Sequence, residues 1–143
     1  MPTCTFFGHR DCSDLIYPKL KSKIERLILS KNIDRFYVGN QGHFDVLVLK
    51  ALRELKLQNP EILYYVVLAY LPNKQLPYDP EETLYPEGLE TVPLRFAITH
   101  RNRWMVDRSD FVIAALSRDF GGAADSVHYA LTHGKEVIRI GSV

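Results

Sequence analysis

Two adjacent glycines near the C-terminal end of the chain, Gly121 and Gly122, are the residues best suited to binding an anion. They follow an apolar stretch over 110–116 that predicts a buried strand, and they precede a predicted helix over 123–132. A glycine turn in that place leaves backbone N–H groups unpaired at a helix N-terminus, where the helix dipole also favours negative charge. The pair therefore predicts a phosphate-binding turn, although such a pair also suits a plain turn that needs positive φ.

Two further loops carry polar residues directly after predicted strands. Gly8, His9 and Arg10 follow the strand over 3–7, and the second loop runs from Gly39 through Asn40, Gln41 and Gly42 to Asp45. In open α/β sheets, ligands bind beyond the carboxyl ends of the strands, where the strand order reverses. If the first strand is central, Arg10 can meet a phosphate held by the glycine pair.

Asp45 has two interpretations, because it lies in the first turn of the predicted helix over 44–57. A carboxylate there is favoured by the helix dipole alone, without any ligand. It could equally contact a ligand at the strand ends.

No metal or cofactor is predicted. Cys4, His9 and Cys12 do not have the spacing of a standard zinc site, and Cys4 lies inside the predicted first strand. Neither glycine-containing loop matches the dinucleotide fingerprint or the lysine-bearing P-loop.

The elements that must position these loops alternate between strands and helices. This alternation predicts a Rossmann-like α/β three-layer sandwich with a mainly parallel five-stranded sheet in the order 3-2-1-4-5. The predicted strands cover 3–7, 35–38, 62–70, 110–116 and 137–140, and the helices cover 14–30, 44–57, 94–108 and 123–132. A length of 143 residues suits one domain over 1–143.

The segment 71–93 differs from the rest of the chain because it is rich in proline. A loop of this length is uncommon in a compact domain. We expect either a surface excursion with one short helical turn or a lid or partner-binding loop.

The global charge is close to balanced at +1, and no stretch that is rich in both basic and aromatic residues is present. Nucleic acid is therefore an unlikely partner. No apolar run approaches the about 18 residues of a membrane span, and no signal peptide is evident, so we expect a cytoplasmic protein that does not enter membranes. A homo-oligomer is compatible with the sequence.

Four pieces together resemble the SLOG superfamily of DprA- and LOG-related domains, and within it the YpsA-like branch. The matching pieces are Phe6-Phe7-Gly8-His9-Arg10, the stretch 37–45, the stretch 101–105 leading into 109–113, and Gly121-Gly122-Ala123 with Tyr129-Ala130. The resemblance covers nearly the whole chain except the proline-rich loop. It implies a Rossmann-like fold whose crevice binds a nucleotide or nucleotide-derived ligand.

The resemblance also suggests contacts and an alternative activity. Ligand contacts are expected from Gly8, His9, Arg10, Gly39, Asn40, Gln41, Gly42, Asp45, Arg101, Gly121, Gly122 and Ala123. LOG-type relatives are nucleotide N-glycosidases, and Arg101 falls on an arginine of that family, while His128 replaces the catalytic glutamate. The candidates for catalysis are Arg101, Asp45, Asp125 and His128. A third possibility is DNA association, by analogy with DprA.

Overall fold

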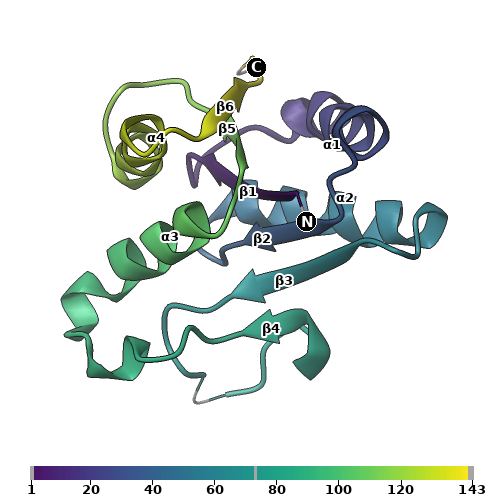
Figure 1. The fold of residues 1–143 in the computed structure, drawn as a ribbon. Helices are drawn as coiled ribbons and strands as arrows, with labels where there is room; N and C mark the ends of the chain where they lie inside the picture. Colours follow the sequence, from purple (N-terminus) through teal and green to yellow (C-terminus); the bar gives the residue numbers. More distant parts are fainter. Residues whose placement is uncertain (1, 73, 142–143) are drawn as a thin grey trace.

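A parallel sheet forms the middle layer of the molecule. The computed structural model describes residues 2–72 and 74–141. In these residues, six strands follow the order β4-β3-β2-β1-β5-β6, and every neighbouring pair is parallel (Figure 1). The strands are β1 (Thr3–Gly8), β2 (Arg35–Val38), β3 (Leu63–Val67), β4 (Thr83–Leu84), β5 (Phe111–Ala115) and β6 (Glu136–Arg139).

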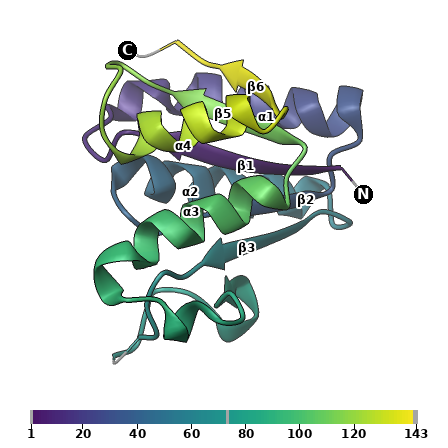
Figure 2. The ribbon, with the colours of Figure 1, turned by 60° about the vertical axis from the view of Figure 1, so that its left-hand side comes forward.

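Helices cover both faces of the sheet, as the alternation of elements predicts. α1 (Tyr17–Lys31) and α2 (His43–Gln58) pack on one face, and α3 (Ala97–Asp107) and α4 (Gly122–Thr132) pack on the other (Figure 2). Successive strand residues point to opposite faces, so Phe6 and Phe36 join the α1–α2 core while Phe7 and Tyr37 join the α3–α4 core. The result is an α/β three-layer arrangement.

The predicted sheet is wrong in strand count and therefore in order, because it lacks β4. This strand contains only two residues, Thr83 and Leu84, and it pairs with the end of β3. A two-residue strand between prolines has no periodicity that sequence analysis could detect. The five predicted strands keep their mutual neighbours, and β1 lies between β2 and β5.

The predicted helix over 94–108 begins later than expected. Leu94–Phe96 forms a 3-10 turn, and the α-helix starts at Ala97. Phe96, which the predicted helix includes, is 46% exposed, and the Arg95 guanidinium lies 4.7 Å from its ring centroid. Met105 is buried, and Ile98 is half-buried.

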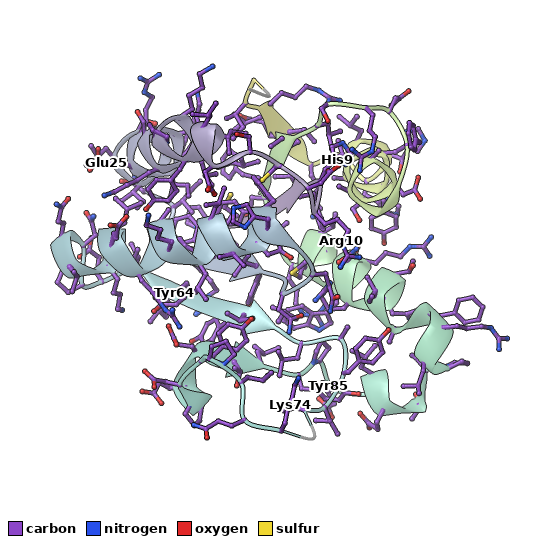
Figure 3. The ribbon with its side chains drawn as sticks, turned by 180° about the vertical axis from the view of Figure 1, so that it is seen from behind. His9, Arg10, Glu25, Tyr64, Lys74 and Tyr85 are labelled. Carbon is purple, nitrogen blue, oxygen red and sulfur yellow. The ribbon has the colours of Figure 1, made fainter. Side chains whose placement is uncertain are left out.

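The proline-rich segment is fastened to the sheet and to α2. Glu82 accepts hydrogen bonds from Arg53 Nε at 2.9 Å and Nη2 at 2.8 Å, and from the Tyr64 hydroxyl at 2.6 Å. Arg53 is the main reason that the pKa of Glu82 falls to about 2. Figure 3 shows Tyr64 between α2 and the segment that carries Tyr85. The segment thus has more order than the single helical turn that we expected: two 3-10 turns, Pro80–Glu82 and Leu89–Thr91, and β4.

None of the helices in the described residues is long and apolar enough to cross a membrane.

Candidate functional site

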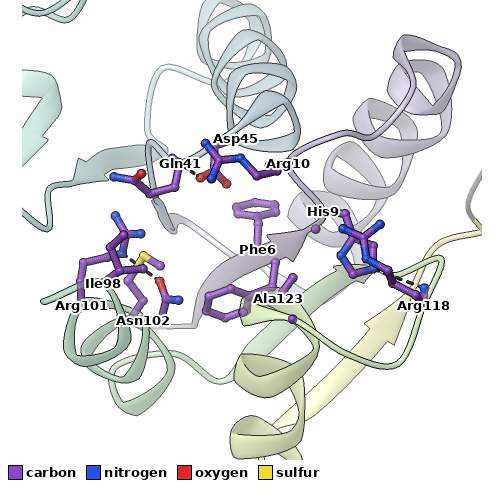
Figure 4. Close-up of a pocket in the computed structure, with 16 residues that line it drawn as sticks. Phe6, His9, Arg10, Gln41, Asp45, Ile98, Arg101, Asn102, Arg118 and Ala123 are labelled. Atoms are coloured by element: carbon purple, nitrogen blue, oxygen red, sulfur yellow. Dashed lines mark hydrogen bonds between the residues drawn. The ribbon is translucent and has the colours of Figure 1, made fainter. Parts of the chain in front are cut away.

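A cavity of about 330 Å³ lies at the carboxyl ends of the central strands. We call it the strand-end cavity, and Figure 4 shows its walls. Ten of the twelve predicted ligand contacts line it: Gly8, His9, Arg10, Gly39, Gln41, Asp45, Arg101, Gly121, Gly122 and Ala123. The loops after β1, β2 and β5 and the helix α3 therefore come together as the topology requires.

The loop after β1 and the loop after β2 pack directly against each other. The His43 N–H donates to the carbonyl of Arg10 at 3.0 Å. A Cβ at Gly42, whose φ is 113°, would lie 2.3 Å from the Arg10 Cβ. A glycine at position 42 therefore permits the close approach of the two loops, which explains why Gly42 itself does not line the cavity.

The loops after β1 and β5 meet on the opposite side of the cavity. His9 is buried, and its Nε2 accepts from the backbone N–H of Arg118 at 3.4 Å. The Arg118 guanidinium pairs with Asp11 at 3.3 Å and lines the cavity. Figure 4 shows His9 and Arg118 together on this side, with Arg101 and Asn102 across the cavity. The side-by-side position of β1 and β5 thus places the His9 imidazole and the Arg118 guanidinium at one wall.

The N-terminus of α4 opens into the cavity. Gly121 is its N-cap with a φ of 100°, and no side chain caps this helix end in the described residues. The first backbone hydrogen bond closes from Asp125 N–H to the Gly121 carbonyl at 2.9 Å. The N–H groups of the residues before Asp125 have no acceptor within the helix. They are oriented as in an anion-binding helix end. A side chain added at Gly122 would meet open space.

Arg101 supplies a buried guanidinium to the same cavity. Only 2% of the residue is exposed, and its Nη1 donates to the Val67 carbonyl at 2.8 Å while its Nε donates to Asn102 at 2.9 Å. These acceptors are neutral, so they position the guanidinium without cancelling its charge. Burial lowers the pKa of Arg101, and the charge of Asp45 partly offsets that effect.

Asp45 is the one carboxylate among the described residues that line the cavity. Its Oδ2 accepts from the Gln41 backbone N–H at 2.8 Å, so the side chain holds the loop after β2. Burial raises the pKa of Asp45 to about 6, against the opposing effects of that N–H and of Arg101. A Cβ at Gly39 would lie 3.0 Å from Oδ2 of Asp45 and 3.1 Å from the Arg101 guanidinium carbon, so the missing side chain leaves room for both groups.

Four of the predicted site residues lie away from this cavity. Asn40 and Gly42 face a neighbouring cavity instead. Asp125 and His128 are exposed, because Ala124, Val127 and Ala130 form the buried face of α4. The predictions omitted Arg118 and Asn102, which do line the strand-end cavity. The signal for Arg118 was its place in the loop that carries Gly121.

The two cysteines do not approach a metal-binding arrangement. No group of three or more histidine, cysteine or acidic side chains suited to a metal ion occurs within residues 2–72 and 74–141. Cys4 is fully buried in β1, and burial raises the pKa of its thiol.

Comparison with known proteins shows the fold and no more. No protein-family model matches the chain, and no curated protein sequence matches it. Among solved structures, the chain is similar to DNA processing protein A (DprA) from Streptococcus pneumoniae, with a TM-score of 0.58 and 17% sequence identity. The similarity covers 96% of this chain and 58% of DprA. The chain therefore has an α/β fold similar to that of DprA and spans little more than half of that protein's length.

Proposed function

We propose that the chain binds a nucleotide or nucleotide-derived ligand and holds its phosphate at the N-terminus of α4. The observation that carries this proposal is the charge arrangement of the strand-end cavity. Arg10, Arg101 and Arg118 line it together with an uncapped helix end. Among the described residues Asp45 is the one carboxylate in the lining, while Asp11 pairs with Arg118 from outside it. Guanidinium groups and helix N-terminal N–H groups are the donors that phosphate oxygens prefer.

The remaining contacts follow from this placement. Gln41 and Asp45 lie on the wall formed by the loop after β2, where they would meet the sugar of a nucleotide. This arrangement would suit a single SLOG-like domain over 1–143 of the YpsA-like branch. Ala123 lines the cavity at the start of α4 without a hydroxyl, so the backbone N–H groups would be the main phosphate donors there.

Thermal unfolding in the presence of phosphates tests the proposal. A ligand that binds only the folded state raises the unfolding midpoint, so AMP and other nucleoside monophosphates should raise it in a concentration-dependent way. Gly122→Asp should abolish this shift, because the new carboxylate would occupy the place of the phosphate. The matched control is Gly122→Asn, which has the same shape without the charge. A Gly122→Asp protein that still binds AMP as the wild type does would refute the proposal.

The position of Asp45 favours a second candidate, nucleotide N-glycosidase activity. A general acid or base works best when its pKa lies near the working pH, and the carboxyl of Asp45, with a pKa of about 6, lines the proposed binding cavity. Arg101 would position the substrate, whereas the exposed side chains of Asp125 and His128 lie outside the cavity lining. Free adenine should then appear on chromatography when the protein is incubated with AMP. Its absence at high protein concentration would eliminate this candidate and leave binding untouched.

DNA association remains a third candidate because the similar structure is that of a DNA processing protein. A gel shift that weakens with added salt is the required result, since phosphate-backbone contacts release counterions. No shift at low salt would remove this candidate.

A further inference from the structure

A second cavity lies next to the strand-end cavity, between α2 and the proline-rich segment. This α2 cavity has a volume of about 530 Å³, and it shares Gly39 and Asp45 with the strand-end cavity. Its walls come from α2, from the loop after β2, and from Pro77 and Tyr78 of the segment. The two cavities are therefore neighbours across the backbone of Gly39 and the side chain of Asp45.

The charged side chains around the α2 cavity have partners elsewhere. The Lys50 ammonium lies 4.5 Å from the centroid of the Tyr17 ring, and Glu54 accepts from the Tyr17 hydroxyl. Arg53 is held by Glu82. Because these charges are engaged, the α2 side of the cavity is left with aliphatic stems and apolar side chains. Val46, which is apolar and 59% exposed, is one of the latter.

The opposite wall is aromatic and held in place. Arg53 Nη2 donates to the Pro77 carbonyl at 3.2 Å, and the hydrogen bonds of Glu82 fasten the residues that follow. The half-buried Tyr78 ring packs against the main core, close to Asp45 and to the Asn40 side chain. The cavity thus combines an aromatic ring, an aliphatic wall and the polar side chains of Asn40 and Asp45. The Asn40 Oδ1 accepts from Gln41 Nε2 at 3.2 Å and from Arg101 Nη1 at 3.4 Å, which holds this amide in place.

We propose that the α2 cavity binds the uncharged, planar ring of a nucleobase that belongs to the ligand whose phosphate occupies the strand-end cavity. A base requires apolar contact on its faces and hydrogen-bonding groups at its edge, and this cavity supplies both. The inference rests on the proposed function, because the phosphate site places the ligand beside the shared wall. It assigns the proline-rich segment a role in ligand selectivity through Tyr78.

The test compares two probes, AMP and ribose 5-phosphate, which share a sugar phosphate and differ by the base. Their dissociation constants are measured by calorimetry for the wild type, Tyr78→Ala and Val46→Gln. AMP should bind the wild type more tightly than ribose 5-phosphate does. Both variants should lose about 5- to 100-fold in AMP affinity, the range expected for a lost stacking surface. Their affinity for ribose 5-phosphate should stay unchanged, which also shows that they fold.

Two controls separate contact with the base from general damage. Tyr78→Phe keeps the ring and should bind AMP nearly as the wild type does. Leu57→Gln makes the same kind of change as Val46→Gln at a position of α2 that is 83% exposed and outside both cavities, so it should have no effect.

The outcomes distinguish the two proposals. If AMP keeps its advantage over ribose 5-phosphate in Tyr78→Ala and Val46→Gln, the base lies elsewhere and the inference is overturned. If the wild type binds both probes equally, the base makes no contact and the inference is again overturned, while the phosphate site stands. If neither probe binds, the proposed function itself fails.

Discussion

Replacing Asp45 with asparagine should stabilise the protein at neutral pH, although it removes a hydrogen-bonded carboxylate. The amide oxygen of asparagine can still accept from the Gln41 N–H, so the loop after β2 keeps its anchor. The variant lacks only the negative charge. Because burial disfavours that charge, its presence lowers the stability of the native structure.

The magnitude follows from the raised pKa. A rise from 3.8 to about 6 corresponds to about 3 kcal/mol, at about 1.4 kcal/mol for each pH unit. Because the folded carboxyl binds its proton more tightly than the unfolded one, ionisation destabilises the native state progressively from about pH 4 to about pH 6, and the full cost persists above. Solvent in the cavity reduces this to about 1–2 kcal/mol, which is the stabilisation expected for Asp45→Asn at pH 8.

Urea unfolding of the wild type and of Asp45→Asn at pH 4 and pH 8 measures this difference. The stabilisation should be present at pH 8 and should nearly vanish at pH 4, where the Asp45 carboxyl of the folded wild type is protonated and uncharged. Asp119→Asn, which changes an exposed loop carboxylate, should stay within about 0.5 kcal/mol at both pH values. If Asp45→Asn is destabilised equally at pH 4 and pH 8, the carboxylate is a structural acceptor and the reasoning is refuted.

Three further predictions concern the loops and the ligand. Gly42→Ala should destabilise the fold by about 1–3 kcal/mol in urea unfolding, because its Cβ would overlap Arg10 and its φ of 113° disfavours a side chain; unchanged stability would show that the loops can separate freely. Glu82→Leu should cost about 1–3 kcal/mol, because the Tyr64 hydroxyl, the Asp79 N–H and the partly exposed Arg53 guanidinium lose their acceptor. Replacing Arg53 with leucine as well should restore part of the loss, and an additive double variant would contradict this. AMP should bind Asp45→Asn more tightly than wild type at pH 8, because the carboxylate of Asp45 lines the same cavity as the proposed phosphate site; equal affinities in calorimetry would argue against a phosphate in that cavity.

The residues that sequence analysis placed well are those controlled by local pattern and by strand order. Gly8, Gly39 and Gly121 are examples: each follows a predicted strand, and all three line the strand-end cavity. The residues that it misplaced depend on distant contacts. Gly42 serves the approach of Arg10, and the missed strand β4 is defined by its pairing with the end of β3. Neither effect has a signature in the nearby sequence.

The pairing of β1 with β5 has a consequence for how the site arises during folding. Residues 4–8 lie beside residues 111–115 in the sheet, and residues from 6 to 123 line the strand-end cavity. A chain that emerges from the ribosome cannot complete this cavity until α4 has been made. Unfolding of almost any central element would also remove part of it. Ligand binding should therefore protect the amide hydrogens of the whole sheet from exchange rather than those of one loop, since the ligand recognises only the fully assembled state.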